Sequence, residues 1–213
     1  MGQEIRHPLF ARFFDRLSRL MERDLGPVRD RLLGGLTGRV LELGAGNGIN
    51  FSHYPSTVAE VVAIEPEPFL RAKAEAAAGR APIPVTVRPG LAGELGVDPG
   101  SFDAAVCSLV LCSVPDQRMA LDDLRNALRP GGELRFLEHV VGQGSAKRRV
   151  QRGFDRSGIW PGMAGGCHCS RDTLAALRAS GFEIDDVRTV DLGPAWFITN
   201  PHVVGVARAG SAG

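Results

Sequence analysis

Three glycines and one acid have the clearest chemical purpose in this sequence. Gly44, Gly46 and Gly48 follow a short apolar run at residues 40–43, and Glu65 ends a second apolar run 21 residues after the first glycine. Apolar runs of this length are typical of buried parallel strands. Glycines directly after a strand let the backbone close on a ligand, because they carry no side chain and adopt positive φ angles. The pattern therefore predicts a ligand-binding edge at the carboxyl ends of two strands.

The spacing of the glycines distinguishes between cofactors. A dinucleotide site uses G-x-G-x-x-G, whose last glycine lets helix and strand pack around a pyrophosphate. This turn reads G-x-G-x-G, with Ala45 and Asn47 between the glycines. Glu65 is placed to accept hydrogen bonds from both ribose hydroxyls of an adenosine. The alternatives are a purely structural turn and a solvated carboxylate, and the adjoining Pro66 weakens the second.

The glycine turn, with Glu42 inside the strand before it, resembles motif I of the class I S-adenosylmethionine-dependent methyltransferases. The resemblance implies S-adenosyl-L-methionine as cofactor and S-adenosyl-L-homocysteine as product. Many of these enzymes place an acid for the adenine amino group where this chain has Leu91, so we expect an apolar or backbone contact there. The expected cofactor-binding residues are Glu42, Gly44, Ala45, Gly46, Gly48, Asn50, Phe51, Glu65, Pro66, Leu91, Ala92, Ser108 and Leu109.

Strand and helix signals alternate along most of the chain. Strands are expected at residues 40–43, 61–64, 85–88, 102–108, 134–137, 183–192 and 202–207. Helices are expected at residues 72–78, after Asp116 as N-cap, and at residues 171–179 with Ser170 as N-cap, whereas residues 142–166 are expected to be irregular. Such alternation implies one sheet whose strand ends meet at a common edge. The resemblance implies an α/β, Rossmann-like, seven-stranded and mostly parallel sheet with an antiparallel last strand and helices on both faces.

A helical region precedes the first strand. From Pro8, apolar residues recur at helical spacing, and Gly26-Pro27 is expected to end this helix before a second one at residues 28–36. We interpret residues 1–36 as an N-terminal helical cap. It either packs on the core or covers the cofactor and supplies an apolar wall to the acceptor site, and it also has the character of a helix that touches a membrane surface.

The composition limits the number of domains, the kinds of partner and the compartment that we expect. The 213 residues, 44% of them hydrophobic, suit a single domain at residues 1–213 with a full core. The net charge of +1 gives no electrostatic reason to expect a nucleic-acid partner. No apolar run is long enough to span a bilayer, and the first ten residues lack the layout of a signal peptide. We therefore expect a cytoplasmic protein with free thiols, whose oligomeric state the sequence does not indicate.

More narrowly, the sequence resembles the mammalian microsomal alkyl thiol methyltransferases and their bacterial relatives. The residues that carry this resemblance are Asn50-Phe51 with Tyr54-Pro55, the run SLVLCSV at 108–114, Glu138-His139-Val140, Trp160, Gly166-Cys167, Arg171 and Pro201-His202 with Gly205. The resemblance implies S-methylation of a small-molecule thiol or of sulfide.

A thiol acceptor raises the question of a base, because a pKa of about 8.5 leaves only a few per cent thiolate at neutral pH. His139 follows the strand at 134–137 and, with an unperturbed pKa of about 6.5, is the candidate catalytic base. The alternative is a packing histidine, and for His168, the next candidate, it is a role in ordering its loop. The acceptor site is expected to be lined by Phe14, Cys112, Trp160 and His168.

Other chemistries stay open at this point. The motif Cys167-His168-Cys169 invites a zinc site, but zinc normally takes four ligands and no second cysteine pair has ligand spacing, so we expect no metal. Arsenite is a minor candidate acceptor. A lipid head group or quinone methylated at nitrogen or carbon is the main enzymatic alternative. A non-catalytic protein that binds S-adenosylmethionine is the alternative from another class.

Overall fold

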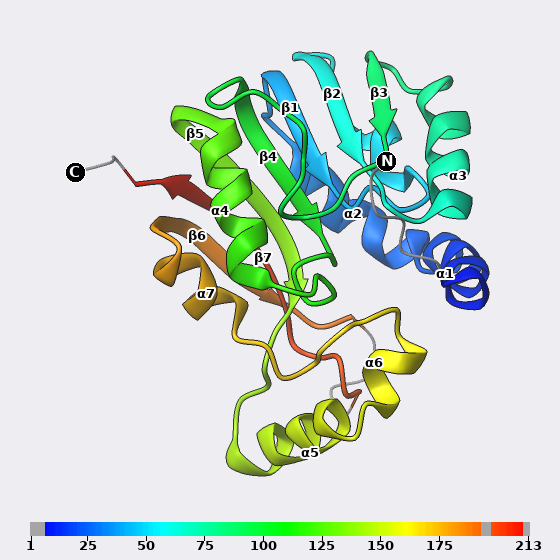
Figure 1. The fold of residues 1–213 in the computed structure, drawn as a ribbon, viewed down its shortest axis with the longest axis vertical. Coiled ribbons are helices and arrows are strands. Elements are labelled where there is room, and N and C mark those ends of the chain that lie inside the picture. Colours follow the sequence, from blue (N-terminus) through cyan, green and yellow to red (C-terminus); the bar gives the residue numbers. More distant parts are fainter. Residues whose placement is uncertain (1–6, 193–196, 211–213) are drawn as a thin grey trace.

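A computed structural model of the chain describes residues 7–192 and 197–210 (Figure 1). Its strands form one seven-stranded sheet in the order β3-β2-β1-β4-β5-β7-β6. The strands are β1 (Gly38–Leu43), β2 (Val58–Ile64), β3 (Val85–Arg88), β4 (Phe102–Ser108), β5 (Leu128–His139), β6 (Phe182–Val190) and β7 (His202–Ala209). The helices are α1 (Pro8–Leu20), α2 (Glu22–Leu33), the short 3-10 helix η1 (Ile49–His53), α3 (Pro68–Ala78), α4 (Gln117–Ala127), α5 (Ser145–Arg156), α6 (Ile159–Met163) and α7 (Thr173–Ala179).

The sheet is parallel except for β7, which runs antiparallel to both β5 and β6. Helices cover both faces, with α4 and α7 on one side and α2 on the other (Figure 1). Side chains alternate along a strand, so Leu41 of β1 packs in the same core cluster as Leu121 of α4, while Val40 packs in the cluster of Leu32 of α2. The expected α/β fold, including its antiparallel last strand, is confirmed.

The register of the central strands aligns their carboxyl ends. Leu43, the last residue of β1, pairs with Ile64 of β2 and Cys107 of β4. Ser108 in turn pairs with Leu137 of β5. The residues that follow these strands therefore leave the sheet at one edge, and α1, α5 and α6 lie at the same end of the molecule (Figure 1).

The N-terminal helices break at a different place from the one expected. The boundary lies at Met21, between α1 and α2, and the pair Gly26-Pro27 sits inside α2. Proline removes one backbone donor from a helix, but the amide of Leu25 still bonds the Met21 carbonyl and the amide of Gly34 bonds that of Asp30. The expectation that Gly26-Pro27 ends a helix is therefore wrong. Residues 1–6 of the expected cap lie outside the described residues.

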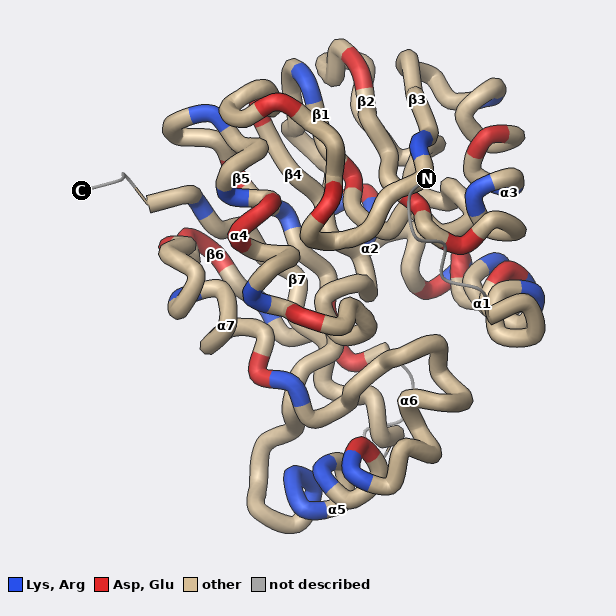
Figure 2. Tube along the Cα trace, in the orientation of Figure 1, with Lys and Arg blue, Asp and Glu red and all other residues tan. Residues whose placement is uncertain are grey.

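Residues 142–166, expected to be irregular, contain the helices α5 and α6. Lysine and arginine are good helix formers, and they make α5 the strongly basic helix seen in Figure 2. The N-cap of α7 is Asp172, whose carboxylate accepts from the Ala175 amide, and not Ser170, which bonds Asp155 instead. The expected cap Asp116 is confirmed by its bond from the Met119 amide. The connection at 193–196 lies outside the described residues.

Across the described ranges, 7–192 and 197–210, no helix combines the length and apolar character needed to cross a bilayer.

We predict that one substitution, glycine to alanine, has opposite effects at two places. A Cβ at Gly205 of β7 would lie 2.5 Å from the Asp186 carbonyl oxygen and 2.6 Å from the Phe136 ring. Such overpacking costs about 1–3 kcal/mol, so Gly205→Ala should lower the melting temperature by several degrees. Gly153 of α5 has open space around it, and Gly153→Ala should gain about 0.5–1 kcal/mol. Thermal unfolding of both variants checks this, and an unchanged melting temperature in Gly205→Ala would contradict it.

Candidate active site

The glycine turn after β1 has the backbone that its sequence predicts. Gly44, Gly46 and Gly48 have φ angles of 67°, 58° and 76°. The amides of Gly44 and Ala45 both bond the Ile64 carbonyl at 2.8 and 3.1 Å, which fastens the turn to the end of β2. A Cβ at Gly44 would lie 2.5 Å from the Val110 side chain. Glycine is therefore required there by conformation and by space.

Glu65 lies at the end of β2 with its carboxylate against this turn. One oxygen accepts from the Gly46 amide at 2.7 Å and the other from the Glu67 amide at 2.9 Å. The side chain is buried, and burial raises the pKa of Glu65 to about 7. A carboxylate offers about four acceptor positions, so two remain for hydroxyl donors of a ligand.

Three of the predicted residues stabilise the glycine turn through buried contacts. The buried Glu42 carboxylate accepts from Asn50 Nδ2 at 2.7 Å and from the Tyr54 hydroxyl at 2.9 Å, and burial raises its pKa to about 7. Asn50 accepts in turn from the buried guanidinium of Arg29 in α2. Phe51 packs under Gly48, where a Cβ would meet its ring at 2.8 Å. The side chains of Glu42, Asn50 and Phe51 thus hold the turn in place.

Helix α1 lies over the turn. The Phe14 ring comes within 3.1 Å of the position that a Cβ on Gly46 would take. Asn47 Nδ2 donates to Asp15 Oδ1 and to Ser18 Oγ, both at 2.9 Å. Asn47 was not among the predicted site residues, and its place between two glycines was the only sequence signal for it.

Leu91 and Ala92, which follow β3, form a tight turn closed by an isolated bridge from Leu91 to Glu94. Both side chains are half-buried, and Ala92 packs against the core. Pro66, next to Glu65, is half-buried and accepts from Arg71 through its carbonyl oxygen. All three residues follow strands that end at the site edge.

The loop after β4 forms the opposite side of the site. Leu109 has φ of 60°, and no other non-glycine residue in the described part of the chain has a positive φ. The completely buried carboxylate of Glu138 accepts from the amides of Val110 at 2.8 Å, Leu111 at 2.9 Å and Cys112 at 3.3 Å. Burial raises the pKa of Glu138. The loop is therefore held in a strained conformation by Glu138, a residue near the end of the neighbouring strand β5.

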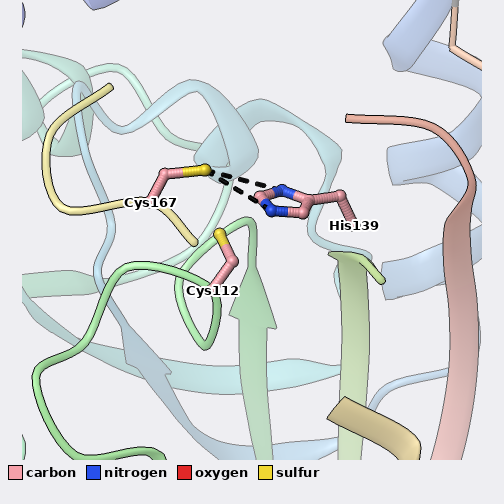
Figure 3. A group of neighbouring side chains, drawn as sticks. All are labelled: Cys112, His139 and Cys167. Carbon is pink, nitrogen blue, oxygen red and sulfur yellow. Dashed lines mark hydrogen bonds between the residues drawn. The ribbon is translucent and has the colours of Figure 1, made fainter. Parts of the chain in front are cut away.

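At the third corner of the site, the side chains of Cys112, His139 and Cys167 lie close together (Figure 3). Cys167 Sγ lies 3.4 Å from His139 Nε2 and 3.8 Å from Nδ1, and Trp160 Nε1 donates to the same sulfur at 3.4 Å. Cys112 completes the group. The hydrogen bond with Cys112, together with burial, raises the pKa of the Cys167 thiol. His168 turns its side chain to the Gly166 carbonyl at 2.8 Å. Cys167 was not predicted as a site residue.

Two buried side-chain atoms within the described residues lack a hydrogen-bond partner, Asn47 Oδ1 in the glycine turn and Ser108 Oγ at the end of β4. Buried polar atoms are nearly always paired. These two atoms lie in the glycine turn and at the end of β4, along the edge that the strand ends form, so the residues present fit a ligand with its own polar groups.

Solved structures share this architecture. An S-adenosylmethionine-dependent methyltransferase from Mesorhizobium loti superposes with a TM-score of 0.64 over 86% of this chain and 97% of that one, at 23% identity. A geranyl diphosphate methyltransferase in complex with GPP and sinefungin gives 0.67 over 88% and 78%, at 14% identity. Residues 41–136 match the family model described as a methyltransferase domain. The fold and site define a class I S-adenosylmethionine-dependent methyltransferase, which uses S-adenosylmethionine as cofactor.

Two human relatives indicate which family within this class the chain belongs to. Human thiol S-methyltransferase TMT1B is 35% identical over a match of 182 residues, and the match covers 82% of this chain and 73% of the human protein. Human thiol S-methyltransferase TMT1A is 33% identical over 172 residues, 79% and 69% respectively. The chain belongs to the family of these proteins.

We predict that Glu65→Gln weakens S-adenosylmethionine binding about tenfold or more, because a hydrogen bond to a charged group contributes about 1.5–3 kcal/mol. With the pKa of Glu65 raised to about 7, wild-type affinity should fall as the pH drops from about 8 to about 6, while the variant should bind equally at both. Calorimetric titration measures this. Glu67→Gln, which alters the cap of α3, is the matched control and should keep the wild-type pH dependence. A pH dependence that persists in Glu65→Gln assigns it to another group.

Proposed function

We propose that this protein transfers the methyl group of S-adenosylmethionine to the sulfur of a small thiol or of sulfide. The observation that carries the proposal is the buried corner at the end of β5, where His139 lies among Cys112, Cys167 and Trp160 at the carboxyl edge of the sheet. The names of the human relatives support it.

Methyl transfer needs an acceptor in line with the methyl carbon and the sulfonium sulfur. When bound, S-adenosylmethionine supplies the electrophilic methyl group. The chain's task is to align the two partners and exclude water, and such alignment is worth about 7–11 kcal/mol. Glu65 and the glycine turn would hold the nucleoside, the backbone at Ser108 and Leu109 would border the methionine part, and Phe14 of α1 would exclude water above the turn.

A thiol acceptor must also lose its proton. His139 Nε2 faces the His168 carbonyl oxygen at 3.1 Å, and Cys167 Sγ lies 3.4 Å from Nε2 and 3.8 Å from Nδ1. A neutral imidazole in the tautomer that donates through Nε2 accepts through Nδ1. His139 is thereby placed to take the proton of an acceptor at this corner.

Two observations argue against the alternative functions. The corner offers an imidazole beside two cysteines, which suits an acceptor that has to lose a proton, as a thiol does. The glycine turn, Glu65 and the loop that Glu138 holds are all in place, which argues against a non-catalytic protein that only binds the cofactor.

We predict release of S-adenosylhomocysteine with sulfide, alkyl thiols and aryl thiols, and not with a quinol, phosphatidylethanolamine or arsenite. His139→Ala should lower thiol turnover at least tenfold near neutral pH, because a positioned base contributes about 10²- to 10⁴-fold, and should leave cofactor affinity unchanged. Turnover only with the other acceptors would contradict thiol methylation. Full activity of His139→Ala at every pH would contradict the role of that side chain.

We also propose that the surface formed by α1, α5 and α6 touches an anionic membrane from the cytoplasmic side. Helix α1 exposes Leu9, Phe13 and Leu20 beside several arginines, and α5 and α6 expose apolar residues beside a basic run (Figure 2). The Phe10 ring of α1 packs on Gly165, so α1 adjoins the segment that directly follows α6. Basic amphipathic helices lie in the membrane interface. All four cysteines are free thiols, as suits a reducing compartment.

To test the membrane contact, we predict that the protein co-sediments with vesicles that contain phosphatidylserine. We expect little co-sedimentation with neutral phosphatidylcholine vesicles. The double variant Leu9→Gln with Phe13→Gln should lose most of the binding, because burial of each apolar side chain contributes about 1.5–3 kcal/mol. Val187→Gln, on the exposed strand β6, is the control and should bind as the wild type does. Equal binding of all three proteins would contradict the contact.

A further inference from the structure

Cys112, His139 and Cys167 come from three distant parts of the chain, and their sulfur and nitrogen atoms all lie within 4.8 Å of one another (Figure 3). We propose that this trio binds a divalent zinc ion and leaves one coordination position open for the acceptor sulfur. The second half of the proposal rests on the proposed thiol methylation, whereas the metal site itself stands on the geometry of the three side chains.

The distances match a tetrahedral site. Zinc–sulfur and zinc–nitrogen bonds are about 2.3 and 2.0–2.1 Å, so sulfur and nitrogen ligands on one ion lie about 3.6 Å apart. Cys167 Sγ is 3.8 Å from His139 Nδ1 and 3.4 Å from Nε2. The three side chains point toward a common centre from separate directions (Figure 3). Because Cys167 Sγ lies at similar distances from both ring nitrogens, the imidazole has to turn before Nδ1 faces a bound ion.

The groups around the trio are those that tune a metal site. In the tautomer with the proton on Nε2, this N–H donates to the His168 carbonyl oxygen at 3.1 Å, and Nδ1 keeps a lone pair for a metal. Metal-binding histidines commonly donate their other N–H to a carbonyl or carboxylate in this way. Trp160 Nε1 can only donate, and it donates to Cys167 Sγ. A donor on that sulfur favours the thiolate, which is the form that binds a metal.

The backbone ties the three segments together before any ion binds. The His168 amide donates to the Cys112 carbonyl at 2.9 Å, and the Cys112 amide donates to Glu138, the residue before His139. The Arg171 guanidinium donates to the carbonyls of Leu111 and Val114, both at 2.7 Å. The ligands are therefore pre-organised, which lowers the entropy lost when a metal binds.

The sequence motif Cys167-His168-Cys169 had drawn attention to zinc for a different reason, and the structure separates its members. Cys169 Sγ faces Asp155 Oδ1 at 3.3 Å, and the His168 ring faces the Gly166 carbonyl. Only Cys167 turns to the site edge. A ligand set of two cysteines and one histidine, with a fourth position open, is a catalytic and not a structural arrangement.

The open position gives a thiol acceptor a way to lose its proton. The acceptor would bind as a thiolate and release its proton to solvent, since zinc lowers the pKa of its ligands. A lone pair of the coordinated sulfur then forms the new bond to the methyl carbon, while the old carbon–sulfur bond breaks and its electron pair stays on the cofactor sulfur. The thioether leaves, and the metal regains its open position. In the metal-bound state His139 is a ligand, and no separate base is needed.

Metal binding can be tested without any turnover. Chelator-treated protein is titrated with Zn²⁺, and separately with Co²⁺ while thiolate-to-cobalt charge-transfer absorption is recorded. We expect one ion per chain with this absorption, and affinity at least tenfold lower in Cys112→Ser and in Cys167→Ser. Trp160→Phe should lower affinity about 10- to 100-fold. Cys169→Ser, a buried cysteine of the same segment that faces Asp155, is the matched control and should bind as the wild type does.

Absence of a stoichiometric ion, or a cobalt complex without thiolate absorption, would overturn the proposal in the wild-type protein, whether or not the variants fold. Equal affinity in folded Cys112→Ser and Cys167→Ser would overturn it as well. Thiol turnover that is the same with and without metal would refute the open-position role and leave thiol methylation standing. A bound ion without turnover of any thiol would support the metal site and contradict the proposed function.

Discussion

The active-site edge depends on the buried carboxylate of Glu138. An ionised carboxylate without solvent is costly unless hydrogen bonds replace its water, and here three successive amides do so. Those amides belong to the strained loop after β4, which would otherwise bury three unpaired donors. The same loop carries Cys112, and the residue after Glu138 is His139. One hydrogen-bonded carboxylate near the end of β5 thus fixes both sides of the acceptor corner.

On the proposed cofactor side, a buried carboxylate again holds a loop through backbone amides. Glu65 at the end of β2 accepts from the amide of Gly46, so an acid on one strand again holds the loop that follows the next strand. Beneath it, Glu42, Asn50 and Arg29 form a buried chain that joins β1 to α2. Carboxylates at strand ends are therefore structural as well as ligand-binding in this protein. Their burial raises the pKa values of Glu42 and Glu65 to about 7.

The fold and the cofactor edge were predictable because both depend on local signals. Apolar runs, glycine spacing and the position of Glu65 follow directly from backbone geometry. The helices within residues 142–166 were missed because glycines flank a basic stretch whose apolar residues are few. The partners of Asn47 and Cys167 lie far away in the sequence, in α1 and β5. Such contacts are set by how the segments pack over the sheet, and no spacing rule describes that packing.

Two segments that the sheet does not require close over its edge, α1 before β1 and the stretch from α5 to Cys169 after β5. They meet where the Phe10 ring occupies the space that a side chain at Gly165 would need. Because α1 is fastened to the glycine turn and the second segment to Cys112 and His139, the two halves of the site are linked through this contact. The strand ends thus carry the proposed cofactor site, and the two added segments close the corner proposed for the acceptor.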